Sequence, residues 1–475
     1  MTKGPVFGGP SASRRSVMRA IPLLLGGLAI GRGWTLAQAA GEIGPDLATA
    51  AELPGTGSTF PLAVRAGRRH LVDATGRPFL IHGDTAWSLI AQLTREDVLL
   101  YLDDRRARGF NTILVSLLEH RFATNAPANA YGEPPFLQPE AYNTPNRAYF
   151  RHADWVLRRA AERGFLVLLT PSYLGIGGGS EGWYEAMVAN GLVRMRRYGR
   201  YLGRRYRNFQ NILWVHGGDY NPPRKDLVRA IAEGIQEGAP QALHTAHGAP
   251  ETAALDHWQG EPWLQVNNVY TYGPVHLPAL AHFARPERMP FFLLESAYEN
   301  EHGATEQRLR TQAYQALLSG AAGQIFGNNP IWHFDGGGIF AAPVTWQQAL
   351  DSRGAHSMTH LRNLLMALPW WKLRPDRRNR LLTDGLGAEE DRAVAARSVD
   401  RVFALIYLPS DREITLDLRQ LAGPRVTARW YDPSQGQFSR ISGSPFQTTR
   451  LQRFRPDGTN DAGFEDWVLL LESRS

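Results

Sequence analysis

The sequence of 475 residues contains no cysteine, so disulfide bonds are excluded as a source of stability. It also lacks the His-Glu-x-x-His motif of zinc hydrolases and the Gly-x-Ser-x-Gly elbow of α/β-hydrolase esterases. Two glycine-rich stretches, residues 175–179 and 336–338, do not have the strand-to-helix setting of a phosphate or dinucleotide loop. We therefore expect neither a metal nor a cofactor.

Long apolar runs are also scarce, and the one near the start predicts export. Arg14 and Arg15 precede an apolar run, residues 21–30, which is followed by the small-residue site Ala37-Gln38-Ala39. The paired arginines resemble a twin-arginine signal, although Val17 stands where that signal usually has Phe, so the ordinary secretory route stays open. The run is shorter than the roughly 20 residues that span a bilayer. We expect residues 1–40 to be an export signal, an uncleaved anchor being the alternative, and the mature protein to be periplasmic or extracellular without a stable membrane span.

The formal charge of +7 at first suggests an acidic partner such as nucleic acid. Five of these excess charges come from basic residues in the first 39 positions, which contain no acid, so the rest of the chain carries only +2. The other arginine clusters have the pattern of solvated helix and loop faces. We expect no nucleic-acid partner and a monomeric protein.

After a Pro/Gly-rich linker at residues 41–60, apolar runs alternate with helical patterns. Eight strands are predicted at residues 78–83, 111–118, 165–171, 212–216, 243–247, 264–269, 291–294 and 322–326. The predicted helices cover residues 94–108, 146–163, 185–206, 224–238, 275–284, 305–319 and 345–368. This count indicates a (β/α)8 barrel over residues 61–369. A doubly wound sheet is the rival, but no glycine-rich phosphate loop follows the first strand.

Beyond residue 369 the helical periods give way to short alternating runs separated by Pro, Asp and Gly turns. We expect residues 370–475 to form a small antiparallel β-sandwich. The pair Trp370-Trp371 is interpreted as the packed seam between the two domains.

Two of the predicted barrel strands end in a carboxylate. The run Ile212-Leu-Trp-Val215 leads through His216-Gly-Gly to Asp219, and the run 290–294 leads to Glu295. Two carboxylates at strand ends are what a glycosidase needs, one as proton donor and one as nucleophile or base.

Other polar and aromatic residues follow the predicted strands, at the end of a barrel where active sites lie. Polar groups bind sugar hydroxyls, and flat rings cover the apolar faces of sugars. The candidate substrate-binding residues are Asp84, Trp87, Glu119, His120, Tyr173, His216, Asn221, Asn268, Tyr270 and Trp332. Asp84 and Glu119 could instead act as a catalytic partner. The expected partner is an oligo- or polysaccharide.

The chain resembles the apiosidase-like glycoside hydrolases from about residue 63 to its end. The matching pieces are residues 81–87 (IHGDTAW), 109–112 (GFNT), 214–221 (WVHGGDYN) and 294–296 (LES). The resemblance implies a barrel enzyme with Asp219 as general acid/base, Glu295 as nucleophile and apiose on a pectin side chain as the substrate. It also implies that the second domain, with Arg429-Trp-Tyr-Asp-Pro433, is the module whose inherited name mentions collagen binding; we expect it to be structural.

The related clan usually has Asn-Glu where this chain has Gly218-Asp219, so the distance between the carboxylates, and with it retention or inversion, stays open. Retention is favoured, with the pKa of Asp219 expected to be raised by ionised Glu295 and apolar surroundings. An endo-acting cellulase-like or mannanase-like hydrolase and a non-catalytic carbohydrate- or matrix-binding barrel remain alternatives.

Overall fold

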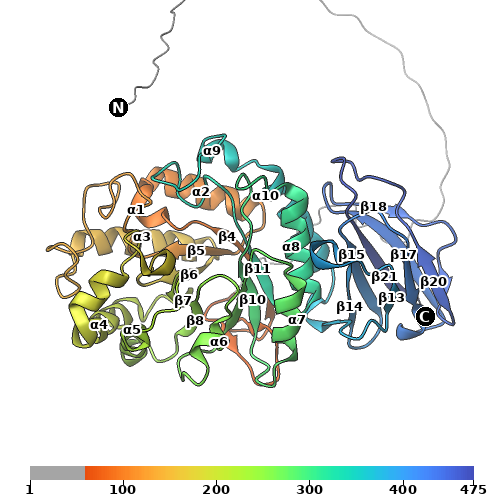
Figure 1. Ribbon diagram of the computed structural model, residues 1–475, viewed down its shortest axis with the longest axis horizontal. Helices are drawn as coiled ribbons and strands as arrows, with labels where there is room; N and C mark the ends of the chain where they lie inside the picture. Colours follow the sequence, from red (N-terminus) through yellow and green to blue (C-terminus); the bar gives the residue numbers. More distant parts are fainter. Residues whose placement is uncertain (1–58, 475) are drawn as a thin grey trace, which may run out of the picture. The chain divides into compact units, whose positions relative to one another are not determined.

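Eight short parallel strands form the centre of the larger domain in the computed structural model, which describes residues 59–474 (Figure 1). The expected export signal, residues 1–40, and nearly all of the expected linker, 41–60, lie outside the described residues. The strands are almost entirely buried, as apolar strands covered on both faces must be. They are β4 (Ile81–Thr85), β5 (Thr112–Ser116), β6 (Leu166–Thr170), β7 (Ile212–Gly217), β8 (Leu243–His247), β9 (Asn267–Tyr270), β10 (Phe291–Glu295) and β11 (Gly323–Phe326).

The strand order closes this sheet into a barrel. It runs β8-β7-β6-β5-β4-β11-β10-β9, and Gly323 of β11 lies opposite Ile81 of β4. Between β8 and β9, the backbone N–H groups of Gln265 and Val266 both donate to the carbonyl of His244. The predicted (β/α)8 barrel is therefore confirmed.

Most helices follow the capping signals in the sequence. The side chains of Thr94, Asn146 and Thr305 accept backbone N–H groups in the first turns of α2 (Arg95–Ala107), α3 (Arg147–Glu162) and α8 (Glu306–Leu318). The expected helix at 345–368 is two helices, α9 (Trp346–Ala349) and α10 (Arg353–Met366), because Ser352 caps a new start. The others are α1 (Leu89–Gln92), α4 (Tyr184–Tyr206), α5 (Lys225–Gly238), α6 (Ala254–Trp258) and α7 (His276–Ala284). Within residues 59–474, none is long and apolar enough to cross a bilayer.

A small antiparallel sheet precedes the barrel. It consists of β1 (Ala63–Val64), β2 (Leu71–Val72) and β3 (Pro78–Phe79). The first half of the predicted strand 78–83 belongs to this sheet, because Pro78 pairs with Val72. The first barrel strand therefore starts three residues later than predicted.

The C-terminal domain contains two antiparallel sheets. The larger has the order β12-β14-β15-β21-β17-β18, with β19 also on β17, and the smaller has the order β13-β16-β20. Side chains from both sheets, among them Ile406, Leu416 and Leu469, share one apolar core, as in a sandwich. The strands are β12 (Leu373–Pro375), β13 (Leu382–Asp384), β14 (Val394–Ser398), β15 (Phe403–Leu408), β16 (Ile414–Asp417), β17 (Arg425–Asp432), β18 (Gln437–Arg440), β19 (Phe446–Gln447), β20 (Leu451–Phe454) and β21 (Trp467–Arg474).

Helix α8 joins this second domain to the barrel through polar contacts. The guanidinium of Arg310 makes two hydrogen bonds of 2.7 Å to Asp466, and both side chains are fully buried. The hydroxyls of Thr311 and Tyr407 lie 2.9 Å apart. Nearby, Trp370 is 6% exposed and packs edge-on against His70.

Candidate active site

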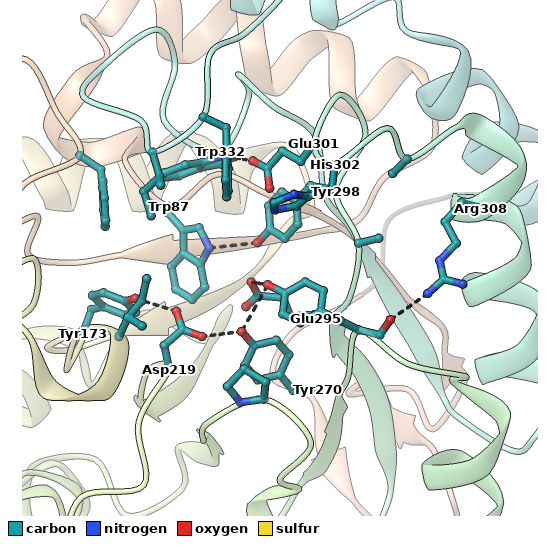
Figure 2. A pocket seen from close by; sticks show the side chains of 18 of the residues that line it. Trp87, Tyr173, Asp219, Tyr270, Glu295, Tyr298, Glu301, His302, Arg308 and Trp332 are labelled. Carbon is teal, nitrogen blue, oxygen red and sulfur yellow. Dashed lines mark hydrogen bonds between the residues drawn. The ribbon is translucent and has the colours of Figure 1, made fainter. Parts of the chain in front are cut away.

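A pocket of about 800 Å³ opens at the carboxyl ends of the barrel strands (Figure 2). This volume is typical of sites for small ligands. The pocket is lined by Trp87, Ser116, Glu119, Phe122, Tyr173, Ile176, Asp219, Pro250, Tyr270, Tyr272, Glu295, Ala297, Tyr298, Glu301, His302, Gly303, Ala304, Thr305, Arg308, Trp332, Ile339 and Phe340.

Asp219 reaches this pocket through an unusual turn at the end of β7. Gly217, Gly218 and Asp219 have φ angles of 98°, 135° and 46°, three successive residues in conformations that L side chains rarely adopt. A Cβ on Gly218 would lie 2.2 Å from the ring of Tyr173, so only glycine fits there. Aspartate tolerates the left-handed region better than most residues. The turn thus aims the Asp219 carboxylate at the pocket.

Two tyrosines hold that carboxylate. The hydroxyl of Tyr173 donates to Oδ2 and the hydroxyl of Tyr270 to Oδ1, each at 2.6 Å (Figure 2). Burial raises the pKa of both phenols, and the nearby carboxylates raise it further, so both remain protonated donors. With both of its oxygens accepting an O–H, the Asp219 carboxylate is fixed in one orientation.

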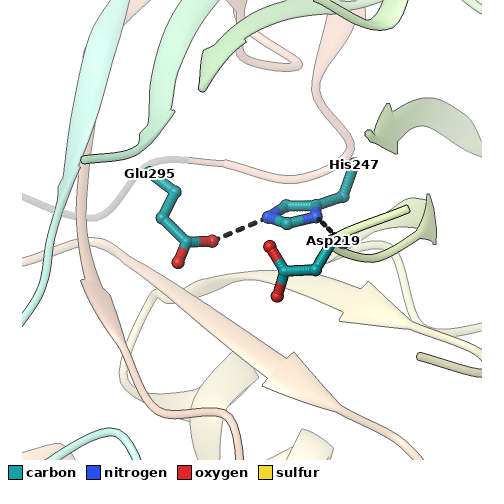
Figure 3. Close-up of side chains that lie close together, drawn as sticks. All are labelled: Asp219, His247 and Glu295. Atoms are coloured by element: carbon teal, nitrogen blue, oxygen red, sulfur yellow. Dashed lines mark hydrogen bonds and ion pairs between the residues drawn. The ribbon is translucent and has the colours of Figure 1, made fainter. Parts of the chain in front are cut away.

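Glu295 is the last residue of β10 and is only 7% exposed. Its Oε2 lies 2.7 Å from Nε2 of His247, at the end of β8, and its Oε1 lies 3.4 Å from the hydroxyl of Tyr272. The other ring nitrogen of His247, Nδ1, accepts the backbone N–H of Asp219 at 2.9 Å (Figure 3). Nδ1 must therefore be unprotonated, which leaves the proton on Nε2 to be donated to Glu295. A single imidazole positions both acids.

Burial raises the pKa of Glu295, and the negative charge of Asp219 raises it further, while the hydrogen bond from His247 opposes both. Sequence reasoning expects the raised pKa on Asp219; the structure assigns a raised pKa to Glu295. Burial lowers the pKa of His247, but its bond to Glu295 and the two negative charges raise it overall. The N–H of Asp219 at Nδ1 still favours the neutral ring.

One oxygen of each carboxylate and a ring nitrogen of His247 lie within 4.8 Å of one another. By distance alone these three groups could hold a metal ion. Both ring nitrogens are already engaged in hydrogen bonds, however, so a metal would have to displace one of them. The close approach of two carboxylates is in itself the arrangement of a glycosidase.

The family of this chain follows from comparison with known families. The sequence model described as "Apiosidase-like, catalytic domain" matches residues 65–372. The chain belongs to this family. A second model, described as "Putative collagen-binding domain of a collagenase", matches residues 375–472. The expected family, and with it the glycoside hydrolase class, are confirmed.

Solved structures agree on the fold of this apiosidase-like chain. A glycoside hydrolase family 5 protein from Bacteroides vulgatus has 24% sequence identity and a TM-score of 0.77, covering 88% of this chain and 95% of that one. A second structure, titled a glycoside hydrolase, has 24% identity and a TM-score of 0.75, covering 88% and 97%. No curated protein sequence matches the chain.

Of the residues expected to bind substrate in this apiosidase-like site, four present rings to the pocket. Trp87, Tyr173, Tyr270 and Trp332 all line it. The indole N–H of Trp87 donates to the hydroxyl of Tyr298 at 3.2 Å. These four rings therefore line the same pocket as the two acids.

The carboxylate of Glu119 also borders the pocket, but it organises a loop. Its Oε1 accepts the backbone N–H groups of His120, Arg121 and Phe122, and its Oε2 accepts the hydroxyl of Ser88. These four bonds occupy the group that was expected to bind substrate or to act in catalysis.

Three other expected binding residues point into the barrel wall. Asp84 is 0% exposed and pairs with Arg105 at 3.0 Å, and burial raises its pKa to about 6. His216 stacks on His244, with 2.8 Å between ring nitrogens. Asn268 is fully buried and bonds to Thr245 and the backbone of β8. The structure does not support substrate binding by Asp84, His216 or Asn268, because each is directed at a neighbouring element.

The last two lie in loops outside the pocket lining. His120 packs edge-on against Trp183. Asn221 accepts the N–H of Ala249 and donates to Thr252, so it ties two loops together. Neither His120 nor Asn221 is among the residues that line the pocket, and their role in substrate binding stays a prediction.

Several residues that line the pocket or contact its two acids were not among the predicted site residues. His247 and Tyr272 follow predicted strands and could have been assigned from that position. Glu301, by contrast, comes from a loop without periodic pattern; it accepts the indole N–H of Trp332 at 2.8 Å. Burial raises the pKa of Glu301 to about 7, so this carboxyl gains its charge near neutrality.

Proposed function

We propose that this chain is an exported glycoside hydrolase that cleaves a glycosidic bond with retention of configuration. The observation that carries the proposal is the approach of Asp219 and Glu295, one carboxylate oxygen of each lying within 4.8 Å of the other. Retaining enzymes separate their two carboxyl groups by roughly 5–5.5 Å, whereas inverting enzymes need roughly 6.5–9.5 Å to admit a water. The short distance supports a direct nucleophilic attack.

In the first half of this reaction, Glu295 attacks the anomeric carbon while Asp219 gives its proton to the departing oxygen. A protonated Asp219 no longer carries the negative charge that raises the pKa of Glu295. The N–H of His247 then stabilises the ionised nucleophile. One proton shared by the pair can thus prepare both acids for their roles.

In the second half, Asp219 is ionised and accepts a proton from water, which attacks the glycosyl ester on Glu295. Its two hydrogen bonds from Tyr173 and Tyr270 suit this anionic state. The water oxygen becomes the hydroxyl of the released sugar, and both acids return to their starting states. The family's name suggests apiose as that sugar.

The deciding experiment measures hydrolysis of a panel of aryl glycosides, apiosides included, and branched plant polysaccharides. The variants to compare are Asp219→Asn and Glu295→Gln, which keep the size of each side chain. Asn also tolerates the left-handed backbone at position 219. Each variant should lose about 10²-fold or more in kcat, because a group that bonds to the reacting atoms is lost. Near-normal kcat in either folded variant would refute the assignment.

Product stereochemistry tests retention separately. Proton NMR during early turnover should show the released sugar first in the anomeric configuration of the substrate. Initial release of the opposite anomer would mean an inverting reaction and would remove the nucleophile role from Glu295.

Export is the remaining part of this proposal, and it is supported by the pattern in residues 1–40. Cell fractionation of the full chain beside an Arg14→Lys/Arg15→Lys variant tests it. Loss of the exported form in the variant would identify the twin-arginine route, and export unaffected by the change would indicate the ordinary route. Retention of the unaltered chain in the cytoplasm would contradict export.

A further inference from the structure

The outer part of the pocket differs chemically from the part that holds the acids. Three of its lining residues are exposed apolar side chains: Ile176 is 56% exposed, Ile339 is 53% and Phe340 is 37%. Ile176 follows β6, while Ile339 and Phe340 follow β11. Single exposed apolar residues are ordinary, but several from separate loops that border one cavity indicate a ligand surface.

The two isoleucines among these side chains are poorly suited to a second sugar. Branched aliphatic groups offer neither a flat face for a pyranose nor a partner for its hydroxyls, which sugar sites supply with aromatic rings and polar groups. Phe340 is fixed by an edge-on contact with His302, with 4.6 Å between ring centroids. The outer part of the pocket therefore presents an apolar surface.

Three of the neighbouring polar side chains make hydrogen bonds within the protein. Arg308 donates to the carbonyl of Tyr272 at 2.9 Å and pairs with Glu390 (Figure 2 shows the first of these bonds). Thr305 accepts the backbone N–H of Arg308 as the cap of α8. Glu301 holds Trp332. Arg308 and Thr305 therefore already make polar contacts within the protein, and an adjoining sugar would have to share or displace them.

Charge argues against an acidic neighbour. Among the residues that line the pocket, four are carboxylic acids, Glu119, Asp219, Glu295 and Glu301, whereas only His302 and Arg308 can be cationic. A uronate placed beside these acids would be repelled, and Arg308 already faces Glu390. The site favours a neutral substrate.

We propose that this outer surface binds an apolar aglycone, so that the substrate is a neutral glycoside of a hydrophobic alcohol or phenol. The inference rests on the proposed hydrolase function for its chemistry. The bond between the anomeric carbon and the aglycone oxygen breaks, Asp219 protonates that oxygen, and water supplies the hydroxyl of the sugar. The products are the free sugar and the apolar alcohol.

Binding of the aglycone can be measured without turnover. The probe is 2-(2-naphthyl)ethanol, titrated calorimetrically into the Asp219→Asn protein. We expect saturable binding that weakens about tenfold or more when Ile339→Ser and Phe340→Ser are added, because apolar contact area is lost. Leu277→Ser, which changes an apolar residue of α7 that is 57% exposed and is not among the pocket-lining residues, should leave the affinity unchanged. Absence of binding, or equal binding by all three proteins, would overturn the proposal.

Turnover separates this inference from the proposed function. For the sugar that the enzyme cleaves, kcat/KM is compared between the 2-(2-naphthyl)ethyl and the ethyl glycoside, whose leaving alcohols have similar acidity. The ratio should be about tenfold or more and should fall toward one in the Ile339→Ser/Phe340→Ser variant. Naphthylethanol binding without cleavage of any glycoside would refute the hydrolase and leave the apolar site standing. Cleavage of ethyl glycosides without naphthylethanol binding would refute the apolar site and leave the hydrolase standing.

Discussion

Nε2 of His247 lies 2.7 Å from Oε2 of Glu295, while its Nδ1 accepts the backbone N–H of the other candidate acid. This ring therefore does two separable things: it stabilises the Glu295 anion and it fixes the turn at Asp219. Two substitutions can divide these effects, because each amide replaces one of the two ring nitrogens.

The first prediction concerns the pH dependence of kcat/KM. In His247→Asn the amide can accept the N–H of Asp219 but no longer reaches Glu295. The hydrogen bond that lowers the pKa of Glu295 is then lost, while burial and the charge of Asp219 still raise it. Since Glu295 must be ionised to attack, the acid limb of the profile should move to higher pH.

His247→Gln is the matched control, because its amide N–H can take the place of Nε2. Its acid limb should stay closer to that of the unaltered enzyme. An acid limb that does not move in His247→Asn, or moves equally in both variants, would show that the imidazole does not stabilise the Glu295 anion.

The same region shows which parts of the fold and the site could be predicted from the sequence. Parallel barrel strands are buried on both faces, so their continuous apolar runs were recognisable, and Asp219 and Glu295 stood out as acids at the ends of such runs. The fold and both candidate acids followed from that pattern. The turn itself was signalled by the Gly217-Gly218 pair.

Side-chain direction could not be predicted in the same way. Successive residues of a strand point to opposite faces, and the strand end decides whether a residue belongs to the barrel wall or to the rim, so a small error in that end changes the assignment. Asp84 illustrates this, because the predicted strand ends at residue 83 whereas β4 continues to Thr85. Asn268 was already placed inside a predicted strand, but the direction of its side chain, toward Thr245 and the backbone of β8, could not be read from the pattern. Loop residues such as Glu301 and Phe340 carry no periodic signal, and only the folded chain brings them to the pocket.

A second prediction tests the two tyrosines that hold Asp219. Tyr173→Phe and Tyr270→Phe each remove one O–H donated to the carboxylate at 2.6 Å. A hydrogen bond to a charged group is worth about 1.5–3 kcal/mol, so kcat should fall by roughly 10- to 100-fold in each variant. Tyr220→Phe is a control beside Asp219 in the chain, since its ring packs on Tyr184. Unchanged kcat in both test variants would mean that these bonds do not serve the reaction.

A third prediction tests the turn at the end of β7. Gly218→Ala would place a Cβ 2.2 Å from the ring of Tyr173 and would force φ of 135° on a residue that resists it. The resulting shift of Asp219 should lower kcat by about 10²-fold, because displacements of about 1 Å have such effects. Gly273→Ala is the control, since its nearest neighbour would be 3.5 Å away. Equal activity of the two variants would show that the turn is not needed to place the carboxylate.

A fourth prediction concerns the buried pair Arg310–Asp466, which links α8 to the residue preceding β21. Both side chains are fully buried and joined by two hydrogen bonds of 2.7 Å. Removing only one partner, as in Arg310→Met, leaves Asp466 as an uncompensated charge and should lower the free energy of unfolding by about 3–5 kcal/mol. Urea denaturation of the protein measures this loss.

The double variant Arg310→Met/Asp466→Leu should recover much of that loss, because it buries no charge at all. The hydroxyl of Tyr407, which donates to Asp466 at 3.0 Å, and Asn460, which donates at 2.9 Å, would each lose a partner, so recovery should be incomplete. If the double variant is as unstable as the single one, the pair contributes mainly through packing and these neutral hydrogen bonds. If the double variant is fully as stable as the unaltered chain, the cost of desolvating the two charges balances their attraction. The contribution of the pair is then the specific docking of the second domain on α8.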